Sequence, residues 1–294
     1  MTALLGGVET GGTWTVCALG TGPGELVARE RLPTTDPGQT LERIVSFFQA
    51  HERPSAIGVG SFGPVDLNPG SPYWGEVTTT PKPGWQHTPV ATVIGERLGL
   101  PVAFDTDVAA AAIGEHRWGA GRGAESVCYL TAGTGIGAGL LVGGRPWHGL
   151  IHPEPGHAAI PHDRDADPFS GVCPAHGDCF EGLASGPALA ARWGRPPEEL
   201  PADHPGWELE ARYLAHGILN IVYVFSPHRV IAGGGVFEHP NLLKMVRVQV
   251  PELIAGYLKT PLLLDKIDRY LVPPQLGDDA GVLGAIAMAE RVAR

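Results

Sequence analysis

The sequence has few cysteines, few basic residues and no long apolar run, and each shortage argues against a class of protein. Four cysteines among 294 residues are too few for a disulfide framework. No apolar run approaches the length of a membrane span, and the first residues lack the basic region and the long apolar region of a signal peptide. We therefore expect a cytoplasmic protein with no membrane partner.

Positive charge is also scarce. The chain has 21 Lys and Arg against 31 Asp and Glu, a formal net charge of -10. This balance argues against a broad nucleic-acid surface, because binding to a phosphate backbone needs clustered Lys and Arg. It does not exclude a nucleotide, since a nucleotide site needs only local backbone donors and a metal ion. The 42 glycines and 28 prolines gather in loops, where functional residues concentrate.

The first half of the chain alternates strands and helices, which predicts an α/β domain. We expect strands over 4–8 and 14–19 around a glycine turn at 9–13, a helix around 41–48, a strand over 56–60, a helix over 90–98 that Gly99 closes, a strand over 102–105 and an alanine-rich helix from about 107.

The second half begins with the same pattern. A strand over 126–131, a glycine turn at 132–137 and a strand over 138–142 come first, and 146–182 should carry little regular structure. Further on we expect helices near 184–193, 207–225, 241–257 and 279–292 and a strand over 229–232. The repeat indicates a duplicated domain, and a cleft between the copies would be a natural ligand site. Two unrelated hairpins explain this feature, taken alone, equally well.

The glycine turns can hold phosphate, because backbone N–H groups converge there without side chains in the way. The turn at 133–139 leads into a predicted strand and not into a helix, which argues against a dinucleotide fingerprint, and no Walker sequence is present. Thr13 and Thr134 add hydroxyl donors at matching places. The run Gly233-Gly234-Gly235 follows a strand and could pass close to a nucleotide, or it could be only a tight βα turn.

Asp105 and Asp107 stand where a predicted strand ends and a helix begins. Ligands of open α/β sheets gather at the carboxyl ends of strands. A carboxylate there can accept the proton of an attacking hydroxyl, as phosphoryl transfer to an alcohol requires. From position alone, either aspartate could equally cap the helix.

Two of the four cysteines belong to a metal-ligand pattern. Cys173, His176 and Cys179 lie within seven residues, and His157 supplies a fourth ligand upstream. Two Cys and two His suit tetrahedral Zn²⁺, and four protein ligands leave no open position, so the zinc would be structural. The alternative is a loop of surface histidines and free thiols. Cys17 and Cys128 fall in apolar strands and are interpreted as inert core residues.

Two glutamates flank the metal-ligand pattern. Glu154 stands three residues before His157, and Glu181 stands two residues after Cys179. A zinc ion that ties these loops together would also fix both carboxylates, which could then orient sugar hydroxyls. Either glutamate could instead be a solvated loop charge.

Motifs along nearly the whole chain resemble those of the ROK family (repressor, open reading frame, kinase), and most of all its zinc-containing bacterial fructokinases. The motifs that carry the resemblance are Gly7–Thr13, Ser61–Asp66, Thr80–Trp85, Asp105–Val108, Ala132–Gly137, His152–His157 and Cys173–Pro187. The last of these is the most specific.

The resemblance implies an α/β fold that is actin-like and hexokinase-like (ribonuclease H-like), with duplicated domains and a cleft between them. We place a smaller domain at 1–112 and a larger one at 113–278, with the zinc-binding loop at 152–182. The C-terminal helix, about 279–294, should pack back on the smaller domain. The implied activity is transfer of phosphate from ATP to the 6-hydroxyl of a free hexose, most favourably fructose. A homodimer is also implied, with no nucleic-acid partner.

The resemblance also implies the role of individual residues. Asp107 would be the general base, and Glu9 would lie near Mg²⁺. The structural zinc would be held by His157, Cys173, His176 and Cys179. ATP and its phosphates would be bound by Gly11, Gly12, Thr13, Gly133, Thr134, Gly135, Gly233, Gly234 and Gly235. The sugar would be bound by Gly63, Pro64, Thr106, Asp107, Glu154, His157 and Glu181.

Two positions depart from the family pattern. Trp14 replaces a lysine that often follows the Gly-Gly-Thr sequence, and Ala109 replaces a common asparagine. These departures keep open a sugar binder without activity. Two further alternatives are a kinase of the same family that prefers mannose or glucose, because the sequence does not reveal which hydroxyl epimer fits, and a sugar-responsive regulator, because the family includes such proteins. The regulator is disfavoured, because the phosphate hairpin begins at Leu4 and leaves no room for a helix-turn-helix ahead of it.

Overall fold

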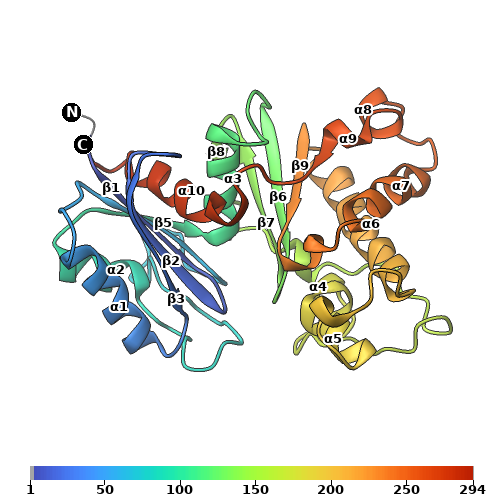
Figure 1. Ribbon diagram of the computed structural model, residues 1–294, viewed down its shortest axis with the longest axis horizontal. Coiled ribbons are helices and arrows are strands. Elements are labelled where there is room, and N and C mark those ends of the chain that lie inside the picture. The colour runs from blue at the N-terminus through green and yellow to red at the C-terminus, as the bar shows by residue number, and fades with distance from the viewer. Residues whose placement is uncertain (1–2, 294) are drawn as a thin grey trace. The chain divides into compact units, whose positions relative to one another are not determined.

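The computed structural model describes residues 3–293 and contains two five-stranded sheets (Figure 1). The chain divides into two compact units. One unit contains the residues up to 123, the segment 139–153 and the chain from 275 onward, and the other contains 124–138 and 154–274. The domain limits expected from the sequence, at 112 and 278, stay a prediction.

The first sheet has the strand order β3-β2-β1-β4-β5. The first three strands are antiparallel neighbours, and β4 and β5 run parallel to β1. Its strands are β1 (Leu5–Thr10), β2 (Trp14–Gly20), β3 (Leu26–Pro33), β4 (Ile57–Ser61) and β5 (Val102–Thr106).

The second sheet repeats this arrangement. Read from its other edge, its order is β8-β7-β6-β9-β10, with β9 parallel to β6 and β10 parallel to β9. Two sheets with the same connectivity confirm the predicted duplication. The strands are β6 (Ser126–Ala132), β7 (Ile136–Val142), β8 (Arg145–Pro146), β9 (Arg229–Gly233) and β10 (Leu271–Val272).

The helices of the first unit are α1 (Pro37–Gln49), α2 (Val90–Leu98), α3 (Asp107–Trp118) and α10 (Ala280–Ala289), with a 3₁₀ turn η4 (Gly277–Asp279). Those of the second unit are α4 (Phe180–Ala184), α5 (Gly186–Trp193), α6 (Gly206–Val224), α7 (Leu242–Ile254), α8 (Pro261–Leu264) and α9 (Ile267–Tyr270), with 3₁₀ turns η1 (Pro155–His157), η2 (Pro197–Glu199) and η3 (Gly235–Glu238). Over residues 3–293, none of these helices is both long and apolar enough to cross a membrane.

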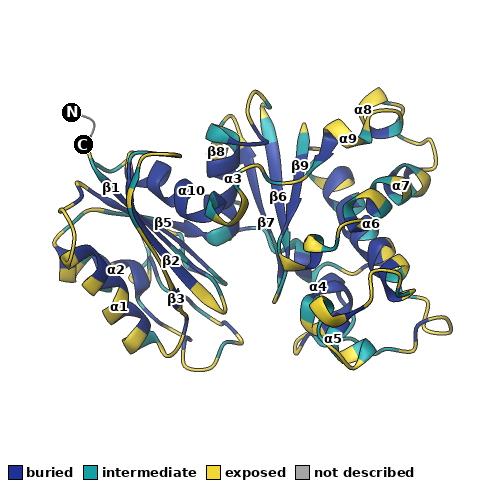
Figure 2. Ribbon diagram, in the orientation of Figure 1, coloured by how far each residue is buried: buried dark blue, intermediate teal, exposed yellow. Residues whose placement is uncertain are grey.

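Alternating side chains of the first sheet build two separate cores. On β2, Cys17 and Leu19 pack against α1 and α2, whereas Val16 and Ala18 pack against α10. A strand buried on both faces reads as a continuous apolar run, which is why β2 is visible in the sequence. Figure 2 shows the helix surfaces that face the sheet as buried and the outer surfaces of α1 and α2 as exposed.

Small residues let α10 approach the first unit's backbone closely. A Cβ atom on Gly58 of β4 would lie 1.8 Å from the carbonyl oxygen of Ala285, and one on Gly284 would lie 1.6 Å from that of Ala110 in α3. No side chain fits in either place, so glycine is required for this packing. Helix α10 therefore packs directly on β1, β4 and α3 of the first unit.

The helices and strands mostly lie where the sequence placed them. Helix α2 has the predicted bounds, and Gly99 ends it in the left-handed conformation with φ of 60°. Cys17 and Cys128 are buried in the core, as predicted. Strand β3 was not predicted. It is an edge strand with mostly exposed side chains, so it lacks the apolar pattern that reveals a buried strand.

Candidate active site

The carboxyl ends of three parallel strands meet at one edge of the first sheet. Thr10 at the end of β1 pairs with Ser61 of β4, which pairs with Thr106 of β5. The Thr10 hydroxyl also donates a hydrogen bond to the Ser61 hydroxyl at 2.9 Å. The first glycine turn, the Gly63-Pro64 segment and Asp107 therefore leave the sheet at the same edge, where α/β sheets bind ligands.

Asp107 is the first residue of α3, and its carboxylate accepts a hydrogen bond from the Val108 N–H at 2.8 Å. Thr106 caps the helix, because its hydroxyl accepts the Ala109 N–H at 3.1 Å. The N-cap of α3 is therefore Thr106, and neither Asp105 nor Asp107 caps this helix. Burial raises the pKa of Asp107 to about 6, against the lowering effect of the backbone hydrogen bonds. Such a carboxyl group is ionised at neutral pH and can still accept a proton.

Glu9 is the second acid at this edge. Burial, together with the nearby charge of Asp107 and the charges of Asp279 and Asp278, raises the pKa of Glu9 to about 8, although a hydrogen bond from the Val282 backbone lowers it. Carboxylate oxygens are hard ligands that suit Mg²⁺, and a divalent cation would relieve the repulsion among these acids. Glu9 therefore offers the type of ligand atom that magnesium prefers.

The first glycine hairpin joins β1 to β2. The Gly11 N–H donates to the Trp14 carbonyl at 2.8 Å and closes the turn, while Gly12 and Thr13 are exposed at its tip. The ammonium group of Lys82 donates to the Gly12 carbonyl at 2.6 Å. A cation therefore lies at this turn, although it is not at position 14.

The two departures from the family pattern differ in their surroundings. The Trp14 side chain is 44% exposed, and the Arg31 guanidinium lies 4.4 Å from the centre of its ring, at cation–π distance. Ala109 is buried in α3, and its N–H is used by the Thr106 cap. With these two residues in place, the Gly11 N–H still bonds to the Trp14 carbonyl and Asp107 is the first residue of α3.

Two histidines tie the loop after β8 to this edge of the sheet. His148 Nε2 lies 3.0 Å from Asp105 Oδ2, and the other carboxylate oxygen of Asp105 accepts the Thr106 N–H at 2.7 Å. The bond to Asp105 raises the pKa of His148. His152 Nε2 accepts the Val65 N–H at 3.1 Å, and burial lowers the pKa of His152.

In the second unit, two glycine loops lie side by side. Thr131 near the end of β6 pairs with Gly233 at the end of the parallel strand β9. The turn 133–135 after β6 and the run 233–235 therefore leave the second sheet at the same edge. A Cβ atom on Gly234 would lie 2.5 Å from the Ala132 carbonyl oxygen, and its φ is 93°, so this position requires glycine.

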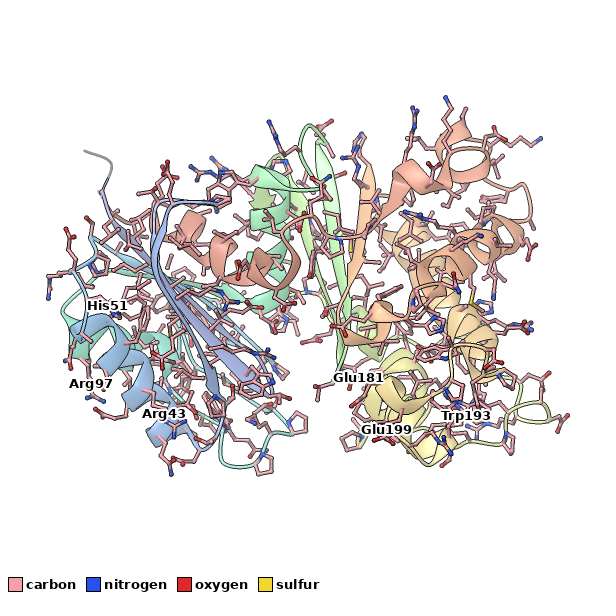
Figure 3. The ribbon with its side chains drawn as sticks, in the orientation of Figure 1. Arg43, His51, Arg97, Glu181, Trp193 and Glu199 are labelled. Carbon is pink, nitrogen blue, oxygen red and sulfur yellow. The ribbon has the colours of Figure 1, made fainter. Side chains whose placement is uncertain are left out.

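Glu181 in α4 (Figure 3) contacts the second glycine hairpin directly. Its Oε2 atom accepts the Ile136 N–H at 2.9 Å, and a Cβ on Gly135 would lie 2.7 Å from the same oxygen. Glu154 immediately precedes η1, and its carbonyl accepts the His157 N–H at 3.1 Å. Each glutamate is thus attached to an ordered turn, and neither is a mobile loop charge.

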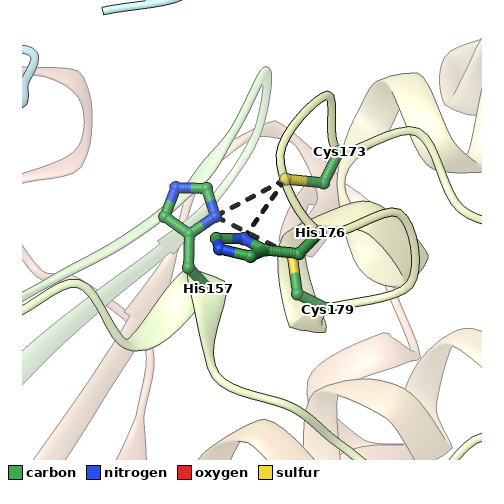
Figure 4. Close-up of side chains that lie close together, drawn as sticks. All are labelled: His157, Cys173, His176 and Cys179. Carbon is green, nitrogen blue, oxygen red and sulfur yellow. Dashed lines mark hydrogen bonds between the residues drawn. The ribbon is translucent and has the colours of Figure 1, made fainter. Parts of the chain in front are cut away.

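Figure 4 shows the predicted metal ligands His157, Cys173, His176 and Cys179 turned toward one another. Their ligand atoms all lie within 4.8 Å of one another. Cys173 Sγ is 3.7 Å from Nδ1 of each histidine, and Cys179 Sγ is 3.8 Å from His157 Nδ1. Zn–S bonds of about 2.3 Å and Zn–N bonds of about 2.0 Å at tetrahedral angles place S and N about 3.5 Å apart. The cluster therefore fits zinc.

The sequence singled out Asp107, the glycine turns and the metal ligands, and the structure brings together those within each unit as described. It gave no role to Lys82, His148 or His152, and it left Asp105 as a candidate proton acceptor or helix cap. The only available signal was the concentration of histidine in 146–182, because the partners of these side chains are distant in the sequence.

The strand order, repeated in both sheets, defines an actin-like α/β fold. The chain belongs to the ROK family, whose family model matches residues 5–292. It is 43% identical to a fructokinase of Zymomonas mobilis over 97% of this chain and 96% of the relative, and 37% identical to a fructokinase of Pediococcus pentosaceus over 98% of both. It is 27% identical to a glucokinase of Streptomyces coelicolor over 96% of both.

Solved structures give the same result. A ROK hexokinase from Thermus thermophilus superimposes with a TM-score of 0.78 at 29% identity over 98% of both chains. A ROK family glucokinase from Streptomyces griseus, in complex with glucose and AMPPNP, superimposes with a TM-score of 0.76 at 26% identity over 98% of this chain and 99% of the other.

Proposed function

We propose that the protein transfers the terminal phosphoryl group of Mg·ATP to the 6-hydroxyl of a free hexose, with fructose as the preferred sugar. The observation that supports this most directly is the near full-length similarity to fructokinases, at higher identity than to a glucokinase. The raised pKa of Asp107 and its place at a strand end agree with it.

Asp107 would act as the general base. Its carboxylate takes the proton of the sugar hydroxyl while the hydroxyl oxygen bonds to the γ-phosphorus, the bond from that phosphorus to ADP breaks, and ADP leaves. Burial supports this role, because a carboxyl group with a pKa of about 6 is a stronger base than a solvated aspartate.

The phosphates of ATP would be bound by the two glycine hairpins, through Gly11, Gly12, Thr13, Gly133, Thr134 and Gly135. The adenosine end would contact Gly233, Gly234 and Gly235, which leave the second sheet beside the second hairpin. When bound near Glu9, magnesium would neutralise phosphate charge.

The proposed sugar ligands are Gly63, Pro64, Thr106, Asp107, Glu154, His157 and Glu181. Three of them keep a suitable atom after their bonds within the protein are counted. The Thr106 hydroxyl accepts a hydrogen bond as a cap and can still donate its proton, and Glu181 keeps its Oε1 atom. His157 directs Nδ1 at the two sulfurs, which leaves Nε2 for a hydroxyl.

We assign zinc a structural role. The four ligands leave no open coordination position, so a bound zinc would brace the segment from Glu154 to Glu181. Burial raises the pKa of Cys179 to about 11, so the thiolate that zinc needs would form as the metal binds.

The experiment measures ADP release with Mg·ATP over fructose, mannose, glucose and N-acetylated hexosamines. We expect the highest kcat/KM with fructose and loss of most of the rate in Asp107→Asn. If glucose or mannose gives the higher kcat/KM, the fructose assignment is wrong, and the similarity to glucokinases becomes the better guide. If none of these sugars is phosphorylated, the result supports a regulator or a sugar binder instead.

We also propose a cytoplasmic homodimer. Support comes from the family resemblance and from the substrate ATP, which is made and used inside cells. Light scattering of the purified protein measures the mass directly, and a monomer at micromolar concentration would contradict the dimer.

A further inference from the structure

Lys82 is held against the first glycine hairpin by a rigid loop. Trp85, three residues further on, is fully buried, and its indole N–H donates to the Thr35 carbonyl at 2.8 Å. The Trp85 N–H in turn donates to the Lys82 carbonyl at 3.2 Å, and the Lys82 N–H donates to the Thr80 hydroxyl at 3.3 Å. The backbone at Lys82 is therefore fixed on both sides, which places its side chain at the hairpin.

The ammonium group of Lys82 has spare capacity. It can donate three hydrogen bonds, and one of them goes to the Gly12 carbonyl at 2.6 Å. Among residues 3–293, no carboxylate forms an ion pair with Lys82. The chain has a net charge of -10, so a cation left without an anionic partner is notable.

The hairpin tip beside this cation is open. Gly12 is exposed, and a Cβ atom placed on it would meet no atom within 4 Å. Lys82 is also the only lysine of the first unit, because the other three, Lys244, Lys259 and Lys266, belong to the segment 154–274. An open glycine turn with an unpaired ammonium group at its carbonyl is suited to a polyanion.

We propose that Lys82 binds the phosphate groups of the nucleotide at the first glycine hairpin. Its two remaining N–H donors go to phosphate oxygens, beside the backbone donors of the turn. As a compact point charge, the ammonium group also stabilises the negative charge that grows on the leaving ADP. This role rests on the proposed function, which takes the hairpin as a phosphate-binding turn, and it supplies the cation that position 14 lacks.

The test removes the positive charge at position 82 and adds one at position 14 of the same hairpin. Lys82→Met removes the cation and keeps the length of the apolar stem. Trp14 is 44% exposed directly after the hairpin tip, so Trp14→Lys adds a cation to the same turn without opening the core. We expect Lys82→Met to raise the KM for ATP roughly tenfold and to lower kcat, with less than a threefold change in the KM for the sugar. The double variant should recover much of this loss.

Arg97→Met is the matched control, because it removes one positive charge from the same unit (Figure 3). Helix α2 leads into the start of β5, so Arg97 lies at the sheet edge opposite the hairpin. Within residues 3–293 its ion-pair partner is the exposed Glu42, at 2.7 Å, and such pairs contribute little to stability. Arg97→Met should leave both KM values within twofold of the wild type.

Binding of Mg·ATP, measured by calorimetry without sugar, separates this proposal from the proposed function. If wild-type protein binds Mg·ATP and phosphorylates no hexose, the proposed function is wrong. The Mg·ATP affinities of wild-type protein and Lys82→Met can still be compared, and they still test the role of Lys82. Equal ATP affinity in wild-type protein and Lys82→Met overturns the proposal. The proposal is also overturned if Lys82→Met lowers the melting temperature and the double variant with Trp14→Lys recovers none of the lost ATP affinity. Lys82 would then only hold its loop in place.

Discussion

His148 and Asp105 form a hydrogen-bonded pair, with Nε2 of the imidazole 3.0 Å from one carboxylate oxygen. The second oxygen of Asp105 accepts the Thr106 N–H at 2.7 Å. Thr106 immediately precedes Asp107, so the pair fixes the backbone that carries the proposed base. His148 thereby acts on Asp107 through Asp105 and not by contact with the substrate.

Replacement of His148 with alanine should weaken both folding and turnover. It leaves a buried oxygen of Asp105 without its donor, which costs about 1–3 kcal/mol of stability. We expect a kcat lower by roughly tenfold, equivalent to about 1.4 kcal/mol in the activation free energy. His148→Gln keeps an N–H donor near the position of Nε2 and should retain most of the rate. Steady-state kinetics and thermal unfolding measure both effects.

The pH dependence of this pair has a definite sign. The bond to Asp105 raises the pKa of His148 in the folded protein. The pair therefore stabilises the fold fully below the ordinary histidine pKa of about 6.5, and this stabilisation is lost as pH rises through the raised pKa. The difference in melting temperature between wild type and His148→Ala should be larger at pH 6 than at pH 9. His51→Gln, two residues after the end of α1 (Figure 3), is the control. A difference that stays constant with pH would rule out the ion pair.

Sugar phosphorylation should depend on the ionisation of Asp107. Because the pKa of Asp107 is raised to about 6, kcat/KM should fall about tenfold per pH unit below pH 6. Asp107→Asn should lower kcat by about 10²–10⁴-fold, the usual contribution of a general base. Initial rates from pH 5 to 9 measure the profile. Near-wild-type turnover in Asp107→Asn would refute the assignment.

Glu9→Gln should stabilise the protein most at alkaline pH. The pKa of Glu9 is raised to about 8, so the folded state holds a proton that the unfolded state loses near pH 4.5. Stability is therefore lost as pH rises from about 4.5 to 8, at about 1.4 kcal/mol per unit. Glutamine avoids this loss, so the gain in melting temperature without added magnesium should be small at pH 5 and several degrees at pH 8. An equal gain at both pH values would show that the carboxyl group is not buried as described.

Zinc should be present at about one ion per chain, as a closed four-ligand site implies. Cys173→Ser should lose the zinc, melt at a lower temperature and raise the KM for the sugar, since Glu154 and Glu181 flank the ligands. The KM for ATP should change less. His87→Gln, an exposed histidine outside the cluster, should keep the metal. Folded, active wild-type protein that contains no zinc in metal analysis would disprove the structural role.

Sequence patterns predicted the buried elements of this fold well. β2 and β6 read as apolar runs because both faces of each strand are covered, and α2 shows its end through Gly99. β3 stayed hidden because an exposed edge strand needs no apolar pattern. The position of Asp107 followed from the strand–helix junction, and the metal ligands followed from their spacing.

Contacts between distant residues could not be predicted in the same way. The bond from Lys82 to Gly12 joins residues 70 positions apart, and the bond from His148 to Asp105 spans 43. Side chains in irregular loops have no periodicity that reveals their direction, so only the folded chain shows which partner each one meets. Trp85 explains the order of one such loop, because its burial anchors the loop that carries Lys82.

The packing of α10 sets an order of events during synthesis. Its buried side chains Val282, Leu283 and Ile286 complete the core behind β1 and β2, whose residues leave the ribosome first. The N-terminal strands must therefore wait, with one face uncovered, until nearly the whole chain has been translated. Most of the second sheet, from β6 to β9, is translated before α10. The part of the protein that is made first is thus the part that finishes folding last.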